Sequence, residues 1–156
     1  MTKLKSTNTL EAFESWRFPG KKFSFEKIVL LRETNLFGNT YFANYVVWQG
    51  EGREKLLLQH PGSGLWLSQN QHIKMITYET HHRFLGETTF GDHVNIEITS
   101  REIKKWNFVL VFRYYNSTNN AKLGEGWQRV CFMDLKTNRL CEVPRIILNI
   151  VEPIQE

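Results

Sequence analysis

The hydrophobic positions of the chain fall into several short runs and one longer pattern with helical spacing. Short apolar or alternating runs bounded by turn residues predict strands. These strands are expected at residues 23–32, 73–85, 93–103, 106–115 and 122–135. Val94, Ile96 and Ile98 alternate with polar residues, as in a strand with one buried face. Strands joined by short turns of this kind favour an antiparallel sheet.

The longer pattern predicts one long helix over residues 40–58. Asn39 or Thr40 is available to cap its N-terminus. Gly50 and Gly52 lie inside it, and each costs about 1 kcal/mol relative to alanine. That cost is tolerated more readily where another backbone or a ligand must come close.

The remaining segments are less regular. Residues 1–22 are polar and mixed, so we expect an N-terminal extension with one loose helical turn, followed by a single domain at residues 23–156. The Pro, Gly and Ser residues after the long helix predict a break before the next strand. The tail from Cys141 onward fits either a last strand or a short helix.

The order of these elements is one strand, one long helix and four further strands, which predicts an α+β fold. The helix must bury its apolar stripe against one face of the sheet, because the chain offers no other large apolar surface. We therefore expect a hot-dog fold, in which a five- or six-stranded antiparallel sheet wraps around one long central helix. Topology alone does not establish function.

Composition narrows the class of protein. The chain has 156 residues, of which 41% are hydrophobic, and no apolar run reaches the roughly 20 residues of a transmembrane helix. The N-terminus lacks the apolar core of a signal peptide, so we expect a cytoplasmic protein without a membrane partner. The net charge is +4, but the sequence has no block of five like charges, which argues against a nucleic-acid partner. A mild positive charge is suited to bind an acidic carrier protein or a phosphorylated cofactor tail.

Three familiar kinds of site are not indicated. The five histidines show neither His-x-His nor His-Glu-x-x-His spacing, so we expect no metal site. Ser63 lies between two glycines but lacks the Gly-x-Ser-x-Gly pattern of a nucleophile elbow. Cys131 and Cys141 lack the spacing of a redox or zinc site.

Unusual polar residues concentrate along the predicted helix. Tyr45, Gln49 and Arg53 stand at positions i, i+4 and i+8, which places them on one stripe about 12 Å long. A phenol, an amide and a guanidinium on one stripe are suited to bind a carbonyl or a carboxylate. The alternative is that this stripe is the solvent-exposed face of an amphipathic helix.

The loop before the helix offers a second set of polar groups. Asn35 precedes the first turn, where unpaired N–H groups and the positive end of the helix dipole converge. A thioester carbonyl held against the backbone amide of Tyr41 or Phe42 would be polarised, and Asn35 could orient that carbonyl or an attacking water. The alternative is that Asn35 only satisfies the loop backbone. Of the nearby carboxylates, Glu33 is a better candidate base than Glu54, which we expect to be exposed or ion-paired.

These residues carry a resemblance to a known family. The elements concerned are Glu33-Thr34-Asn35-Leu36, Gly38-Asn39, Tyr41-Phe42-Ala43-Asn44-Tyr45, Trp48-Gln49-Gly50 and Arg53-Glu54. They resemble the signature of hot-dog thioesterases of the 4-hydroxybenzoyl-CoA type, and more narrowly that of the thioesterases of enediyne polyketide biosynthesis. The resemblance is strongest over residues 26–58 and does not include the N-terminal extension.

The resemblance implies hydrolysis of a thioester without a cofactor. In the wider family an acidic residue of this loop acts as nucleophile or base, whereas this sequence has Asn35 there, as the enediyne subgroup does. Water would then attack the thioester directly, with stabilisation by hydrogen bonds. By resemblance, Asn35, Arg53 and Tyr45 are the catalytic or positioning residues. Substrate binding would fall to Tyr41, Phe42 and Gln49, with the Phe42 amide as the oxyanion donor.

The resemblance also implies the partners. The substrate would be an acyl or β-ketoacyl thioester on an acyl carrier protein, supplied by a polyketide synthase, or on CoA, and loss of carbon dioxide would follow hydrolysis of a β-ketoacyl chain. Subunits would form a homodimer or homotetramer with active sites between them. Phe42, Val46 and strand aromatics would wall an acyl tunnel. Two alternatives remain open, a general acyl-CoA thioesterase and a non-catalytic acyl-binding module.

Overall fold

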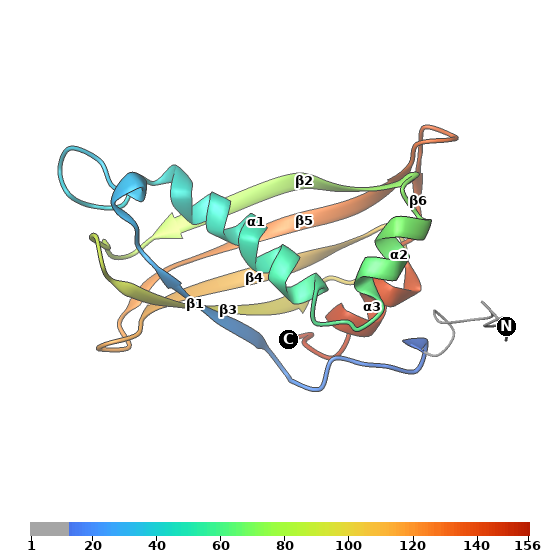
Figure 1. The fold of residues 1–156 in the computed structure, drawn as a ribbon, viewed down its shortest axis with the longest axis horizontal. Coiled ribbons are helices and arrows are strands. Elements are labelled where there is room, and N and C mark those ends of the chain that lie inside the picture. Colours follow the sequence, from blue (N-terminus) through green and yellow to red (C-terminus); the bar gives the residue numbers. More distant parts are fainter. Residues whose placement is uncertain (1–12) are drawn as a thin grey trace, which may run out of the picture.

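The structure is a computed structural model that describes residues 13–156 (Figure 1). Its strands are β1 (Phe23–Ile28), β2 (Ile73–Phe84), β3 (His93–Arg101), β4 (Asn107–Asn116), β5 (Lys122–Asp134) and β6 (Arg139–Cys141). Its helices are α1 (Ala43–Leu57), α2 (Ser63–Gln69), α3 (Arg145–Val151) and the 3-10 turn η2 (Leu31–Glu33). Within the described residues, no helix is both long and apolar enough to span a bilayer.

The six strands form one antiparallel sheet in the order β1-β3-β4-β5-β2, with β6 paired to the end of β5. Figure 1 shows α1 lying across one face of this curled sheet, while α2 and α3 close the end at which α1 terminates. The predicted α+β hot-dog fold is confirmed by this arrangement.

The core lies between α1 and the inner face of the sheet. Val94, Ile96 and Ile98 on β3 are fully buried, as their alternation predicted. On β4 the large side chains of Phe108 and Phe112 point inward, but Val109 and Val111 between them are buried as well, so burial does not alternate on this strand. Because side chains alternate between the two faces of a strand, one face of the sheet receives nearly all of these large apolar groups.

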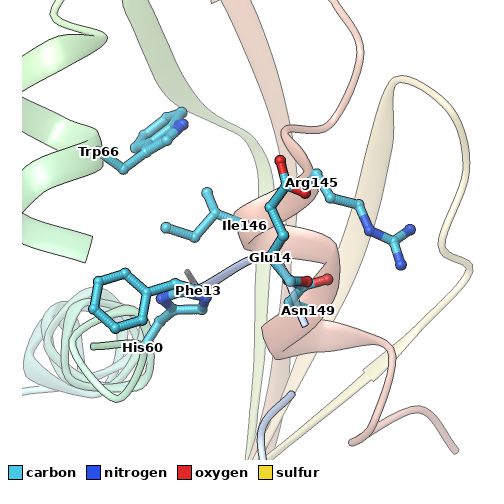
Figure 2. A pocket seen from close by; sticks show the side chains of 7 residues that line it. All are labelled: Phe13, Glu14, His60, Trp66, Arg145, Ile146 and Asn149. Atoms are coloured by element: carbon cyan, nitrogen blue, oxygen red, sulfur yellow. The ribbon is translucent and has the colours of Figure 1, made fainter. Parts of the chain in front are cut away.

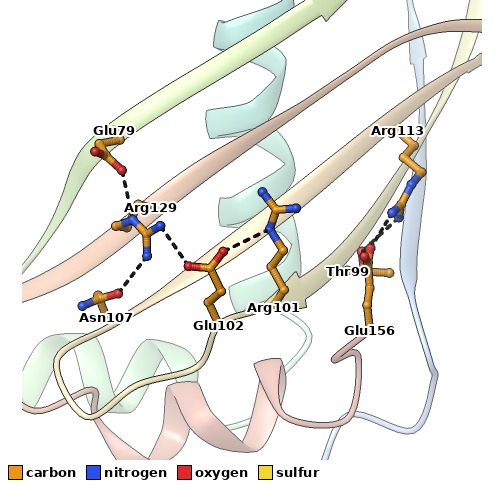
Figure 3. Close-up of polar contacts among 8 residues, drawn as sticks. All are labelled: Glu79, Thr99, Arg101, Glu102, Asn107, Arg113, Arg129 and Glu156. Atoms are coloured by element: carbon orange, nitrogen blue, oxygen red, sulfur yellow. Dashed lines mark hydrogen bonds and ion pairs between the residues drawn. The ribbon is translucent and has the colours of Figure 1, made fainter.

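The outer face of the sheet is held by polar contacts instead (Figure 3). Arg129 on β5 donates to Glu79 on β2, to Asn107 on β4 and to Glu102 in the β3–β4 connection. Arg113 pairs with Glu156 at 2.6 Å, which fastens the last residue of the chain across β3 and β4. These partly exposed ion pairs each contribute little stability alone, but they leave the outer face charged.

Two glycines of α1 have different surroundings. A Cβ atom on Gly52 would lie 2.7 Å from the Phe25 ring and 2.9 Å from Ile98, so a side chain here would separate the helix from the sheet. A Cβ atom on Gly50 would have no neighbour within 4 Å. A close approach is therefore present at Gly52, where it involves side chains and not the expected backbone or ligand, and is absent at Gly50.

The predicted boundaries need correction at the first strand and the long helix. The strand predicted at residues 23–32 ends at Ile28, because its partner β3 begins opposite it at His93 and the chain then turns into η2. The long helix begins at Ala43 with Phe42 at its N-cap position. Asn39 and Thr40 do not cap it, since their side chains bond to the segment that follows β2.

Three further segments also differ from expectation. The break after α1 contains the short helix α2, which the Gly-Ser-Gly sequence did not suggest; the Ser63 hydroxyl donates to the Leu57 carbonyl at its start. The tail forms both the short strand β6 and the helix α3. In the N-terminal extension, Trp16 and Phe18 pack against the core, while residues 1–12 lie outside the described part, so most of the segment expected to hold a helical turn is not described.

Candidate active site

A pocket of about 260 Å³ lies at the N-terminal end of α1. Its lining residues are Asn35, Asn39, Thr40, Tyr41, Phe42, Tyr45, Phe84, Gly86 and Glu87. In Figure 1 the loop that precedes α1 and the end of β2 lie at the same end of the molecule. The structure thus brings together four of the predicted site residues, Asn35, Tyr41, Phe42 and Tyr45.

Glu33 fixes the loop that carries these residues. Its carboxylate accepts hydrogen bonds from the Leu30 backbone N–H at 2.7 Å and from the Trp48 indole at 2.9 Å, and the Lys27 ammonium lies 3.2 Å away. Burial raises the pKa of this carboxyl, but these donors outweigh burial and hold the pKa below its usual range. A carboxylate held by structural partners is poorly suited to act as a base, so Glu33 stabilises the loop instead.

Glu33 also decides which backbone amide is free. The Tyr41 N–H donates to the Glu33 carbonyl at 2.8 Å, so it is not available to a ligand. The Phe42 N–H makes no backbone hydrogen bond within the described residues. Of the two amides predicted as oxyanion donors, the structure therefore leaves Phe42, which lies where the first turn of α1 presents unpaired donors.

Asn35 holds the loop and also lines the pocket. Its Oδ1 accepts from the Phe37 N–H at 2.9 Å, which matches the alternative that Asn35 satisfies the loop backbone. Gly38 closes the same turn with φ of 85°, a conformation that glycine adopts without strain. No bond from the Asn35 Nδ2 to another described residue is present, so this amide N–H₂ remains a donor for a ligand.

Tyr45 forms part of a buried chain of hydroxyl groups. Its hydroxyl lies 3.1 Å from the Thr88 Oγ1, which lies 2.6 Å from the Thr40 Oγ1. Burial raises the pKa of Tyr45, and its bond to Thr88 offsets only part of that rise. The phenol therefore stays protonated and can donate a hydrogen bond at the base of the pocket.

Gln49 and Arg53 continue from Tyr45 along α1 but do not line this pocket. Gln49 is completely buried, donates to the His81 carbonyl and accepts from the Thr80 hydroxyl, both at 3.0 Å. The stripe of Tyr45, Gln49 and Arg53 thus faces the sheet, and the alternative of a solvent-exposed helix face is wrong.

Arg53 is a half-buried cation whose hydrogen-bond partners are neutral. Its guanidinium donates to the Thr77 hydroxyl at 2.5 Å and to the Gln128 amide oxygen at 3.3 Å. Burial lowers its pKa, an effect that Glu54 partly opposes, although guanidinium remains charged at physiological pH. Among the described residues no carboxylate lies within ion-pair distance of Arg53. The position is therefore suited to an anionic or strongly polarised oxygen of a ligand.

The opposite wall of the pocket was not predicted from the sequence. Phe84, Gly86 and Glu87 reach the pocket from the end of β2. His82 lies beside them, with its ring centroid 4.5 Å from Phe84 and 5.0 Å from Tyr45, and burial lowers its pKa to about 4.

A pair of glycines on β5 makes room for side chains next to this wall. A Cβ atom on Gly124 would lie 2.7 Å from the His82 Nε2, and one on Gly126 would lie 2.4 Å from the Gln49 Nε2. Gly124 and Gly126 therefore leave the space that His82 and Gln49 occupy.

A second pocket, of about 180 Å³, lies where α1 ends, and Figure 2 shows its side chains. Its lining residues are Phe13, Glu14, His60, Trp66, Arg145, Ile146 and Asn149. The His60 Nδ1 accepts from the Gly62 N–H, and burial lowers the pKa of this imidazole, which is therefore neutral. This pocket contains none of the predicted site residues, so the pocket beside Asn35 is the candidate active site.

Comparison with known proteins decides the family. A family model described as the thioesterase-like superfamily matches residues 29–151. The chain belongs to the thioesterase-like superfamily. The match covers α1, the loop before it and every strand except β1. A comparison with curated proteins found no match.

Solved structures place this thioesterase-like chain among hot-dog proteins. The dynemicin thioesterase, from a study of polyene binding, is 24% identical, with a TM-score of 0.79 over 86% of this chain and 98% of that one. The 1,4-dihydroxy-2-naphthoyl-CoA thioesterase of Synechocystis is 17% identical, with a TM-score of 0.75 over 83% and 95%. A gentisyl-coenzyme A thioesterase is 20% identical, with a TM-score of 0.70 over 83% and 100%. At these identities the likeness concerns the fold.

Proposed function

We propose that this thioesterase-like protein hydrolyses an acyl or β-ketoacyl thioester. The observation that carries the proposal is the unpaired Phe42 N–H, which lies at the N-terminal end of α1 in a pocket shared with Asn35 and Tyr45. An amide N–H at the positive end of a helix is suited to stabilise the negative oxygen that forms when water attacks a carbonyl carbon.

In this proposal, the thioester carbonyl oxygen binds the Phe42 N–H. The Asn35 amide orients the carbonyl or the attacking water, and the Tyr45 phenol, protonated in its buried chain with Thr88, donates a further hydrogen bond. Water adds to the carbonyl carbon, and the carbon–sulfur bond then breaks to release an acid and a thiol. Tyr41 and the phenylalanine rings of the pocket contact the acyl group.

Arg53 is assigned to the acyl chain beyond the reacting carbonyl. It follows Tyr45 by two turns of α1, about 12 Å along the axis. A guanidinium with no carboxylate partner among the described residues is suited to bind the carboxylate of the β-keto acid once hydrolysis has released it from the Phe42 N–H. Gln49 would hold α1 to β2 between the two sites, and loss of carbon dioxide from the bound acid would complete the sequence implied by the enediyne resemblance.

The carrier in this proposal is an acyl carrier protein supplied by a polyketide synthase. The support is the loop signature around Asn35, the fold shared with the dynemicin thioesterase and the net charge of +4, which suits an acidic partner. A CoA thioester is the second candidate substrate, because two of the similar structures are named as CoA thioesterases.

Thiol release from acyl-carrier and acyl-CoA thioesters tests the proposal. We expect the purified protein to hydrolyse the carrier-bound β-ketoacyl chain faster, and Asn35→Ala and Arg53→Ala to lower kcat by roughly 10²–10³-fold each. Glu54→Ala is the matched control, since Glu54 is an exposed neighbour of Arg53 on the same helix.

Each failure of that assay has a distinct meaning. Absence of thiol release from both substrate classes would contradict the enzyme and favour an acyl-binding module. A strong preference for CoA esters would contradict the link to a carrier protein and leave thioester hydrolysis standing.

A further inference from the structure

The proposed reaction lacks a group that removes the proton of the attacking water. Asn35 occupies the place where the wider family has an acid, and an amide cannot act as a base near neutral pH. A base must reach the pocket from elsewhere in the chain, and it must not already be held by structural bonds. The carboxylates near the pocket can be compared on these two points.

Two of these carboxylates are already used by the fold. Glu33 is held by Leu30, Trp48 and Lys27, as described above. Asp92 accepts from the Thr89 backbone N–H at 2.8 Å, which fixes the turn before β3. Neither of them lines the pocket.

Glu87 differs from both in position and in contacts. It lines the pocket, its side chain is exposed to water, and its one hydrogen bond within the described residues is a long contact of 3.5 Å from the Asn39 Nδ2. The negative charges of Glu87 and of Asp92 both contribute to the raised pKa of the Tyr45 phenol, so only the position of Glu87 on the pocket wall and its lack of structural bonds distinguish it. Glu87 is therefore the carboxylate with access both to solvent and to the reacting groups.

The backbone keeps Glu87 beside the loop of Asn35. The Asn35 N–H donates to the Asn39 carbonyl at 2.9 Å, and the Thr40 N–H donates to the Thr88 carbonyl at 2.8 Å. Asn39 and Thr89 also form an isolated antiparallel bridge. The Thr40–Thr88 bond and the Asn39–Thr89 bridge follow Glu87 in the chain and join the two walls of the pocket, while the Glu87 carboxylate makes only its long contact with Asn39 among the described residues.

We propose that Glu87 is the general base of this active site. The inference rests on the proposed thioester hydrolysis. Glu87 accepts a proton from water as the water oxygen bonds to the carbonyl carbon, and the carbonyl electron pair moves to the oxygen held by the Phe42 N–H. Collapse of this intermediate breaks the carbon–sulfur bond, and Glu87 returns its proton to the departing thiolate.

The test is the pH profile of kcat for the wild type and for Glu87→Gln, with the best substrate from the thiol-release assay. General-base catalysis predicts that Glu87→Gln lowers kcat by roughly 10²–10⁴-fold and removes the decline of the wild-type rate on acidification. Glu125→Gln is the control. Like Glu87, Glu125 is a carboxylate accessible to solvent, but it pairs with Lys122 and lies outside this pocket.

Chemical rescue separates a base from a structural residue. Glu87→Ala should regain activity when formate is added, since formate supplies a carboxylate of a size that the pocket admits, whereas formamide should have no effect. Glu87→Asp, which keeps the carboxylate but shortens the side chain, should retain more activity than Glu87→Gln.

The outcomes distinguish this inference from the function on which it rests. If the wild type hydrolyses thioesters and Glu87→Gln keeps its rate and pH profile, the base assignment is wrong and the hydrolase stands. If Glu87→Ala is inactive and formate gives no rescue, the assignment is also wrong, and the residue acts on structure alone. If the wild type itself releases no thiol, both proposals fail.

Discussion

At the scale of single residues, the site depends on which polar atoms the fold has already used. Glu33 looked like a candidate base from its place before the helix, yet its carboxylate is occupied by Leu30, Trp48 and Lys27. The Tyr41 amide is likewise occupied, which leaves the Phe42 amide free. Residue type alone did not show which polar groups are occupied, because a free carboxylate and a hydrogen-bonded one are the same residue in the sequence.

Replacing Glu33 with glutamine should reveal this structural role through pH. The lowered pKa means that the stabilisation by Glu33 is fully present above its unfolded-state pKa of about 4.3 and is lost as pH falls through the folded-state value. We expect Glu33→Gln to cost about 1–3 kcal/mol of unfolding free energy at pH 7, with the difference from wild type shrinking below pH ~4. Urea unfolding at both pH values measures this.

The control for that experiment is Glu54→Gln, which changes an exposed carboxylate on α1. It should leave the unfolding free energy within about 0.5 kcal/mol of wild type at either pH. An equal loss in both variants would show that net charge, and not the bonds of Glu33, sets the effect.

At the scale of elements, α1 is the clearest departure from a simple pattern. Its stripe of Tyr45, Gln49 and Arg53 is polar, which suggests a solvent-exposed face, yet it packs against β2 and β5. The buried amide is tolerated because strand groups supply its partners, whereas the Arg53 Nε is buried without a hydrogen-bond partner among the described residues. Helical periodicity predicted the existence of α1 and the common face of these residues, whereas the direction of that face depended on the sheet.

The two glycines of α1 give a prediction at the same scale. Gly50→Ala should stabilise the protein by about 0.5–1 kcal/mol, because alanine favours a helix and open space surrounds the position. Gly52→Ala should destabilise it by about 1–3 kcal/mol, because the new methyl group would contact Phe25 and Ile98 at under 3 Å. Thermal unfolding of both variants compares them directly, and equal shifts would contradict the packing described here.

At the scale of the whole molecule, β2 is an edge that nothing in the described chain covers. It is 12 residues long, pairs on one side with β5, and carries Tyr78 with 65% of its side-chain surface exposed. Long open edges invite pairing with another strand. This edge supports the proposal of a homodimer or homotetramer in which two sheets join.

Size-exclusion chromatography with light scattering tests that assembly. We expect at least twice the chain mass of 18.5 kDa, and we expect Tyr78→Lys to weaken association by tenfold or more, since two copies would bring like charges together at the joined edge. Leu67→Lys on α2, which is exposed at 53%, is the matched control. A monomeric wild type, or equal effects of both variants, would contradict pairing along β2.

Sequence patterns were enough to predict the long helix and the five main strands in their order, the alternation that buries one face of β3, and the loop signature around Asn35, because these are properties of neighbouring residues. The folded chain was needed to show that Glu33 is occupied, that the Phe42 amide has no backbone partner among the described residues and that Glu87 meets Asn39 across the pocket. Glu87 and Asn39 lie 48 positions apart in the chain, and they meet because β2 returns antiparallel to β5 beside α1. Contacts at that separation depend on how the sheet curves around the helix, and local patterns carry no record of that curvature.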